Sequence, residues 1–319
     1  MNLHLNVPRC NASFRTTSFR NSVGLTQFNR SLSSLTRRLF KLPSPPPHPS
    51  PHHYDLKSFL AYAEKSSLSL TTTSYVGTHY EYTVQQTLRN VAFSLHRVGG
   101  RSDAGIDLVG TWHLPGHEHA LRAIVQCKSF KTKLGPNIVR ELEGTFHQAP
   151  VGWRTGEHKL GVLVSPREAT KGVREALARS TFPLMWMMVE RGGVLRQVLW
   201  NGRAERQLGL VGLGVEMRYS GAEVEGVTLT WDGEEVPHMD AVEGRMAEVQ
   251  DRWMRLWGIK LESEEEREGL VDAVQGLVPG EKPLLFAEEC STLSGEERAR
   301  VLQAWKRDVD MRLLNSTST

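Results

Sequence analysis

Residues 99–130 read GGRSDAGIDLVGTWHLPGHEHALRAIVQCKSF, and two β-prone runs within them decide the fold. The runs IDLVGTW and LRAIVQCK are joined by the turn-rich LPGHEH, which predicts an antiparallel hairpin. Successive side chains of a strand point to opposite faces, so Gln126 and Lys128 are expected on one face and Cys127 on the other. Asp107 is expected on the neighbouring strand, near that pair.

The segments on either side of the hairpin alternate between helical and strand patterns. Upstream, apolar residues at spacings of three and four predict an amphipathic helix from about residue 75 that ends at Gly99 and Gly100: Tyr80, Val84, Leu88, Val91 and Leu95. Downstream, the sequence predicts a helix in LGPNIVRELEGTFHQA, a strand in KLGVLVS, a helix in PREATKGVREALARS and a strand in FPLMWMMVE. This order favours a mixed α/β sheet flanked by helices.

Composition excludes several classes of protein. The chain has 319 residues, of which 39% are hydrophobic, as in an ordinary globular protein. Its three cysteines, Cys10, Cys127 and Cys290, lie far apart in the sequence and form no CxxC pair, which argues against a disulfide framework and a cysteine zinc site. No apolar run approaches the roughly 20 residues needed to span a bilayer, so no membrane span is expected.

Charge divides the chain into three parts. Residues 1–54 carry a net charge of +7 with no acidic residue, residues 55–220 also carry +7, and residues 221–319 carry −11. An acid-free leader rich in Arg and Ser is typical of a mitochondrial transit peptide, and Arg37, Arg38 and Phe40 form a plausible processing region. We therefore expect residues 1–45 to direct import into the mitochondrial matrix and to be mostly removed. The alternative is a disordered basic arm that binds nucleic acid.

Three further segments follow the predicted leader. Residues 46–74 continue the Pro/Ser/His-rich stretch LPSPPPHPSPHHYD, which predicts a linker and lead-in. Residues 75–190 contain the predicted sheet. Residues 191–319 are expected to add β-hairpins and then amphipathic helices, which together make a mainly helical acidic extension with Trp253, Trp257 and Trp305 on apolar faces.

The helix with Glu81, GIDLVG, VQCK and the next helix together resemble the Mrr-type branch of the PD-(D/E)XK, or restriction endonuclease-like, superfamily. The resemblance covers about residues 75–190. With its basic leader and acidic C-terminal part, the whole chain is similar to the fungal mitochondrial "required for respiratory growth" family. The resemblance implies a restriction endonuclease-like mixed sheet and a metal-dependent nuclease that acts on DNA, with mitochondrial DNA as the expected partner.

The resemblance also implies roles for individual residues. Asp107, Gln126 and Lys128 would be catalytic, and a Mg²⁺ or Mn²⁺ ion would be bound by Asp107, the Gln126 side chain and the Cys127 backbone carbonyl. Glu81 would contact the ion through a bound water, or would contact the residues that bind the ion directly. Hard divalent cations prefer such oxygen ligands, and a lysine can stabilise negative charge that develops on phosphate. Because Gln126 is neutral where related branches have an acid, weaker metal binding is expected.

Basic residues just beyond the second strand are candidates for phosphate contact: Lys131, Lys133 and Arg140. Two alternatives remain open from the sequence. Asp107 can cap the hairpin while Lys128 and the basic loop are simply solvated. A chain with this fold can also be a catalytically inactive nucleic-acid-binding or assembly factor.

Overall fold

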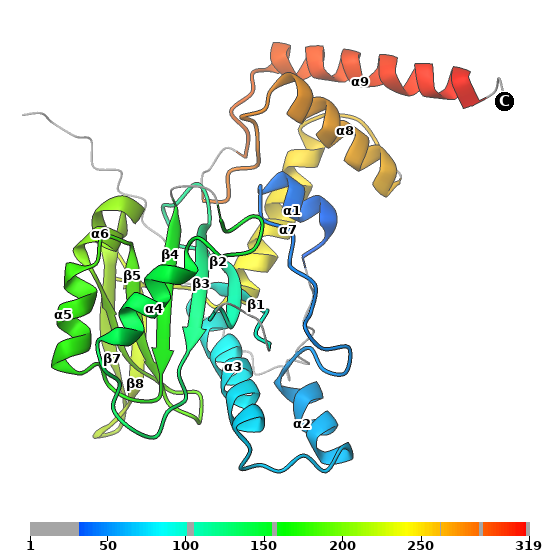
Figure 1. Cartoon of the computed structure of the whole chain (residues 1–319). Coiled ribbons are helices and arrows are strands. Elements are labelled where there is room, and N and C mark those ends of the chain that lie inside the picture. Colours follow the sequence, from blue (N-terminus) through cyan, green and yellow to red (C-terminus); the bar gives the residue numbers. More distant parts are fainter. Residues whose placement is uncertain (1–31, 101–104, 155–157, 262, 287–289, 317–319) are drawn as a thin grey trace, which may run out of the picture. The chain divides into compact units, whose positions relative to one another are not determined.

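The computed structural model describes residues 32–316 except 101–104, 155–157, 262 and 287–289. Its central feature is a six-stranded sheet whose strands lie in the order β1-β2-β3-β4-β5-β6 (Figure 1). The strands are β1 (Phe93–Arg97), β2 (Leu108–Trp112), β3 (Leu121–Cys127), β4 (Lys159–Ser165), β5 (Leu184–Val189) and β6 (Leu195–Trp200). Strands β3, β4 and β5 are parallel and the other pairs are antiparallel, so the expected mixed α/β sheet is confirmed.

The predicted hairpin is the β2–β3 pair. These strands are antiparallel, with Leu108 opposite Val125 and Trp112 opposite Leu121. Just before β2, the Asp107 N–H still donates to the Val125 carbonyl, and the Asp107 carboxylate accepts from the N–H of Cys127, the last residue of β3. The hairpin therefore places Asp107 beside the end of β3, the strand that carries Gln126, as the sequence predicted.

The helix predicted to run to Gly99 is shorter than expected. Helix α3 spans Thr73–Arg89, ends at the C-cap Asn90 and is followed by Ala92 with a φ of 63°. The chain then enters strand β1, which pairs with β2. The prediction was wrong there because Val91 and Leu95 fit a helical spacing but also, with Phe93, the alternation of a strand, and pairing with β2 decided between the two patterns.

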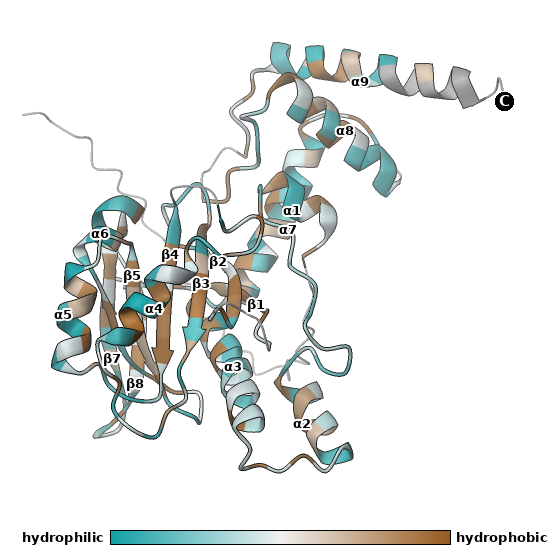
Figure 2. Cartoon of the chain, viewed as in Figure 1, coloured by the Kyte–Doolittle hydropathy of each residue, from teal (hydrophilic) through white to brown (hydrophobic). Residues whose placement is uncertain are grey.

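Helices cover both faces of the sheet. Helices α4 (Asn137–Thr145) and α5 (Lys171–Arg179) pack against Leu163 and Trp186 on one face. Helices α3 and α7 (Met239–Arg255) contribute to the core on the other face, where Val162, Val164 and Met185 point. The strands are correspondingly brown in Figure 2, whereas the outer helical surfaces are largely teal.

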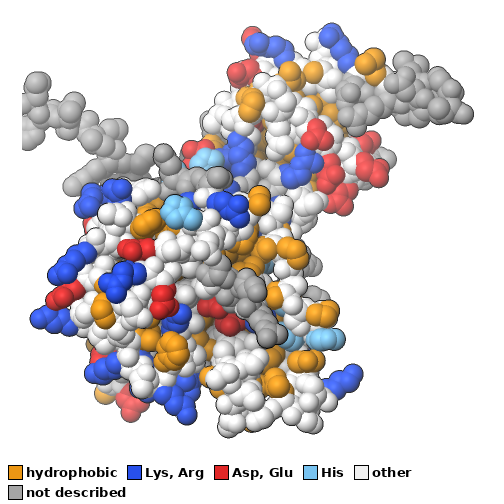
Figure 3. Space-filling view, in the orientation of Figure 1, with side chains coloured by type: hydrophobic (Ala, Val, Ile, Leu, Met, Phe, Trp, Pro, Cys, Tyr) orange, Lys and Arg blue, Asp and Glu red, His pale blue; other side chains and the backbone are white. Residues whose placement is uncertain are grey.

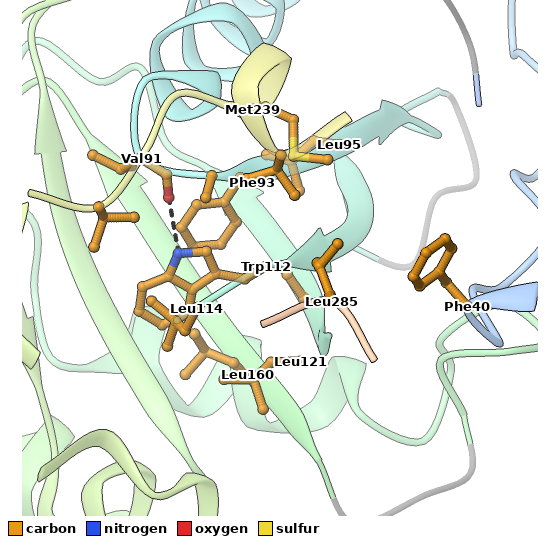
Figure 4. Close-up of a cluster of buried hydrophobic side chains, with 14 of the residues drawn as sticks. Phe40, Val91, Phe93, Leu95, Trp112, Leu114, Leu121, Leu160, Met239 and Leu285 are labelled. Carbon is orange, nitrogen blue, oxygen red and sulfur yellow. Dashed lines mark hydrogen bonds between the residues drawn. The ribbon is translucent and has the colours of Figure 1, made fainter. Parts of the chain in front are cut away.

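Trp112 anchors the core between the sheet and the C-terminal elements. Its indole stacks on Phe93, with ring centroids 4.7 Å apart, and its Nε1 donates to the Val91 carbonyl at 2.9 Å (Figure 4). Leu114, Leu121, Leu160, Met239 and Leu285 belong to the same cluster. Residues from both halves of the chain therefore share one core.

The region after residue 200 adds a small sheet and several helices. Strands β7 (Leu213–Ser220), β8 (Glu223–Trp231) and β9 (Glu234–Glu235) form the second sheet, after helix α6 (Gly202–Leu208) and a 3-10 turn, η1 (Leu210–Gly212). Helices α7, α8 (Glu264–Leu277) and α9 (Gly295–Ser316) complete the expected helical part. Trp253 and Trp257 are buried and Trp305 packs against the core from a half-buried position. None of the described helices is both long and apolar enough to cross a bilayer.

Two short helices precede the core, α1 (Ser34–Leu39) and α2 (Leu56–Lys65). Between them, residues 42–55 form neither helix nor strand. Part of this segment is packed, because the buried His53 lies 2.7 Å, Nδ1 to Oη, from Tyr82 of α3. Of the predicted transit peptide, residues 1–31 lie outside the described residues.

Candidate active site

The candidate active site lies along one edge of the sheet. Strands β3, β4 and β5 are parallel, so they end at the same edge, and the antiparallel β2 begins there. Asp107 immediately precedes β2, and Cys127 is the last residue of β3. Ligand sites in α/β sheets are commonly built at the carboxyl ends of parallel strands, so this edge is the expected place for polar side chains to converge.

The backbone and side chain of Asp107 are held by several hydrogen bonds. Its N–H donates to the Val125 carbonyl at 3.0 Å, and its carbonyl accepts from the Val98 and Gly99 N–H groups at 2.8 and 2.9 Å. Its Oδ2 accepts from the Cys127 backbone N–H at 2.6 Å. The carboxylate is therefore fixed across the end of the β2–β3 hairpin.

Glu81 reaches the same place from helix α3. Its Oε2 accepts from Arg97 Nε at 2.5 Å, and the two side chains are only 13% and 9% exposed. A Cβ at Gly99 would lie 3.1 Å from Glu81 Oε2 and 3.4 Å from Asp107 Oδ1. Both carboxylates thus face the Gly99 backbone, so Glu81 and Asp107 are brought together as predicted.

Gln126 is 3% exposed, and its Oε1 is buried with no hydrogen-bond partner among the described residues. A buried amide oxygen without a partner costs about 1–3 kcal/mol, so an oxygen in this position needs an explanation. Bound ions are one recognised explanation. Gln126 therefore offers an unused acceptor at the end of β3, one residue before Cys127, whose N–H binds Asp107.

Lys128 follows β3 and turns toward helix α4. Its Nζ lies 3.0 Å from Glu141 Oε2, and Glu141 Oε1 accepts from Asn137 Nδ2 at 3.2 Å. The Lys128 backbone N–H donates to the Val164 carbonyl at 2.8 Å, which continues the pairing of β3 with β4. The ammonium group is therefore held at the site edge by the Glu141 carboxylate, a partner that was not predicted from the sequence.

Cys127 points to the opposite face from Gln126, as expected from strand alternation. Burial raises the pKa of its thiol well above the ordinary value, and the nearby carboxylates of Asp107 and Glu81 raise it further, against the effect of Arg97. The thiol therefore stays protonated near neutral pH and is a poor nucleophile. The Cys127 N–H binds Asp107, and metal binding by its carbonyl stays a prediction.

Basic residues surround the loop between β3 and α4. Lys131, Lys133 and Arg140 are exposed and make no ion pair with any residue that the structure describes. Arg167 Nη2 donates to the Lys131 carbonyl at 2.7 Å, and Arg191 Nη2 donates to the Ser129 carbonyl at 3.0 Å. Figure 3 shows blue side chains recurring over the α4–α5 part of the surface and red ones gathered on α8.

Sequence reasoning missed Arg167 and Arg191. Each follows a parallel strand by two residues, since β4 ends at Ser165 and β5 ends at Val189. Both positions therefore fall at the same edge as Asp107. The signal that would have found them is a basic residue just after each parallel strand, and not only after VQCK.

The donor set fits a hard divalent cation. Two carboxylates come together at this edge and a buried amide oxygen lies near the end of the neighbouring strand β3, and such oxygen ligands suit Mg²⁺ and Mn²⁺. The described residues contain no group of three His, Cys, Asp or Glu side chains placed to hold a metal ion. With only two acids and one neutral amide, the site suits weak binding of such an ion completed by water or substrate oxygens.

Comparison with known proteins identifies relatives among fungal mitochondrial proteins. The sequence model of the family "Required for respiratory growth protein 7" matches residues 72–120 and 115–219. An uncharacterized mitochondrial protein of Schizosaccharomyces pombe is 33% identical over 156 residues, which are 48% of this chain and 61% of that protein. The Required for respiratory growth protein 7 of Saccharomyces cerevisiae is 27% identical over 172 residues, covering 41% of this chain and 71% of the yeast protein.

No solved structure matches the chain significantly, so the relationship rests on sequence. The corresponding protein of Candida glabrata is 23% identical over 180 residues, covering 43% of this chain and 71% of its own length. All these relatives are named as mitochondrial, which confirms the mitochondrial location expected from the leader. The matched region includes every candidate site residue, so residues 72–219 of this chain resemble the Required for respiratory growth protein 7 family.

Proposed function

We propose that this chain is a mitochondrial metal-dependent nuclease with a restriction endonuclease-like core, that it hydrolyses DNA phosphodiesters, and that it thereby supports maintenance of the mitochondrial genome and respiratory growth. The observation that carries the proposal is the partnerless, buried Gln126 Oε1, one residue before Cys127, whose N–H binds the Asp107 carboxylate. A merely structural strand end gains nothing from a buried acceptor without a donor, whereas a cation site uses it. The names of the yeast relatives support the link to respiratory growth.

Asp107, Gln126 and the Cys127 carbonyl would hold Mg²⁺ or Mn²⁺, and Glu81 would support them through water. The ion would neutralise phosphoryl oxygens and lower the pKa of a bound water. Arg97 fixes the orientation of Glu81 through their ion pair. Hydrolysis joins the oxygen of water to phosphorus, breaks one P–O ester bond and leaves a proton on the departing oxygen.

Lys128 would stabilise the negative charge that builds on the phosphoryl oxygens, or orient the attacking water. Its ammonium group is held by Glu141 in the present structure, so contact with phosphate requires it to exchange a carboxylate for a phosphate oxygen. Arg167, Arg191, Lys131, Lys133 and Arg140 would bind the DNA backbone beside this position.

A second function is favoured by the ion pair between Lys128 and Glu141. Because Lys128 is paired with Glu141, and Asp107 Oδ2 is already bonded to a backbone N–H, the site also suits a protein that binds nucleic acid without cutting it. The acidic region after residue 220 makes direct DNA contact there unfavourable, so either function would use the α4–α5 side.

The deciding experiment incubates the purified full-length chain with single-stranded, duplex and branched DNA, in Mg²⁺, in Mn²⁺ and in EDTA. The proposal expects cleavage that requires the cation. DNA binding without cleavage of any of these substrates would favour the inactive binding factor, and the absence of both would contradict both functions.

A further inference from the structure

Helix α1 lies within the predicted transit peptide, residues 1–45, yet it is part of the folded core. Its buried residues Leu35 and Leu39 are each 3% exposed, and Phe40, directly after the helix, is 7% exposed. All three belong to the same hydrophobic cluster as Trp112, and Figure 4 includes Phe40 among the drawn side chains. Leu32 packs against the cluster from a half-buried position. The described fold therefore begins before the predicted processing region.

The polar side of α1 is matched to the acidic C-terminal helices. Arg38 forms an ion pair with Asp272 of α8, and Ser34 Oγ donates to Glu268 of the same helix at 3.0 Å. Thr36 Oγ1 donates to Gln250 of α7 at 2.8 Å. These contacts join α1 to two helices more than 200 positions later in the sequence.

The ends of α1 are also fixed. Ser33 caps the helix by accepting from the Thr36 N–H at 3.1 Å. After the helix, Lys41 Nζ donates to the Pro279 carbonyl at 2.7 Å, just beyond α8. Arg37 Nη1 donates to the Pro43 carbonyl at 3.1 Å, and burial lowers the pKa of Arg37, against the effect of Glu243. Contacts of this kind stabilise a folded protein and do nothing for a signal that is read and discarded.

We propose that α1 stays in the mature protein and that proteolytic processing occurs on the N-terminal side of Ser33. Hydrolysis there breaks one amide C–N bond, with the hydroxyl of water going to the new carboxyl group and its proton to the new amine. A cut after Arg38 would instead remove Leu35 from the core, and a cut after Phe40 would remove Leu39 as well, which would expose to water the surfaces of α7 and α8 that α1 contacts.

The two roles of this segment do not conflict. In the unfolded precursor, Arg37 and Arg38 contribute to the basic, acid-free leader that import requires. After folding, Arg38 pairs with Asp272, and the apolar side of the same helix packs into the core. Residues 32–45 thus connect the acidic C-terminal helices to the core around the sheet. The inference concerns the folded chain and does not depend on nuclease activity.

The first test identifies the N-terminal residue of C-terminally tagged protein isolated from fungal mitochondria, by mass spectrometry of its N-terminal peptide. The expected first residue lies at or before Ser33. Any first residue from Ser34 onward overturns the proposal, because the mature chain would then lack part of α1.

The second test compares thermal unfolding of the purified full-length chain with Leu39→Ala and with the matched control Ser34→Ala, which changes an exposed position of the same helix. Leu39→Ala is expected to lower the melting temperature by roughly 5 °C or more, and Ser34→Ala by no more than roughly 2 °C. Equal melting temperatures would show that α1 does not contribute to the folded core and would overturn the proposal.

Discussion

The Asp107 carboxylate accepts a hydrogen bond from the Cys127 backbone N–H at 2.6 Å, and this contact joins the beginning of β2 to the end of β3. A backbone donor cannot be removed by a side-chain substitution, so the orientation of the carboxylate is built into the hairpin itself. Gln126, Cys127 and Lys128, at and just beyond the end of β3, consequently lie at the same edge of the sheet as Asp107.

The sharpest prediction for the proposed nuclease concerns Asp107→Ala and Lys128→Ala. Asp107→Ala is expected to weaken Mg²⁺ binding and abolish cleavage, whereas Lys128→Ala should leave the ion bound and lower the cleavage rate by roughly 10²- to 10³-fold. Calorimetric titration with Mg²⁺ and single-turnover cleavage measure the two effects. Both proteins should fold, since neither side chain fills the core.

Growth on a non-fermentable carbon source shows whether the cell needs this chemistry. If both variants support respiration fully while deletion of the whole chain does not, the metal site has no role in respiratory growth. The inactive binding factor would then account for the requirement.

The sequence predicted the hairpin because Asp107 and Gln126 lie on two short strands with a turn between them, where local patterns are sufficient. It failed at residues 90–97, because choosing strand β1 over more helix depends on pairing with β2, which local spacing does not contain. Local sequence patterns could not predict the contact of Glu141 with Lys128 or that of Arg167 with the Lys131 carbonyl either. They depend on how α4 and the segment after β4 dock on the sheet.

Gly99→Ala tests whether cleavage depends on the spacing between the Glu81 and Asp107 carboxylates, because it removes neither of them. The new methyl group would lie 3.1 Å from Glu81 Oε2 and 3.4 Å from Asp107 Oδ1, so it should push the two apart. Cleavage is expected to fall by roughly 10- to 100-fold, as for other small displacements of catalytic groups. Gly100→Ala is the matched control, because a Cβ there meets nothing within 4 Å. Equal rates for the two variants would argue that this spacing is irrelevant to catalysis.

Gln126→Met should separate stability from activity. Methionine has a similar shape and removes the partnerless buried oxygen, so the free energy of unfolding should stay unchanged or rise by about 1 kcal/mol, while cation binding is lost. Urea unfolding and Mg²⁺ titration measure the two quantities. Gln86→Met changes an exposed glutamine of α3 and should alter neither. A marked loss of stability in Gln126→Met would mean that the amide has a structural role.

DNA binding should depend steeply on salt if the loop between β3 and α4 contacts phosphates. Each basic residue removed there is expected to lower the slope of log K against log salt by about 1, because one fewer counterion is released. Lys131→Ala and Lys133→Ala, both in this loop, test this in fluorescence anisotropy titrations over a range of salt concentrations. Lys57→Ala, at an exposed position of α2, is the control and should leave the slope unchanged. A slope insensitive to both site variants would exclude this loop from the interface.

Stability should fall at mildly acidic pH because of buried histidines, His113 above all. Burial, helped by the charge of Arg37, lowers the pKa of His113 to about 3, and the ring lies 2.9 Å, Nε2 to Oγ1, from Thr111. Below the unfolded pKa of about 6.5 the unfolded chain binds a proton that the folded chain does not, so stability that is complete above pH 6.5 is lost as the pH falls toward 3. The expected loss is about 1.4 kcal/mol per pH unit.

Urea unfolding at pH 7.5 and 5.5 measures this loss in the free energy of unfolding. The loss should be smaller for His113→Gln than for the unchanged chain. For His52→Gln, which changes an exposed position, it should equal that of the unchanged chain. An identical pH dependence in all three proteins would assign the loss of stability to other groups.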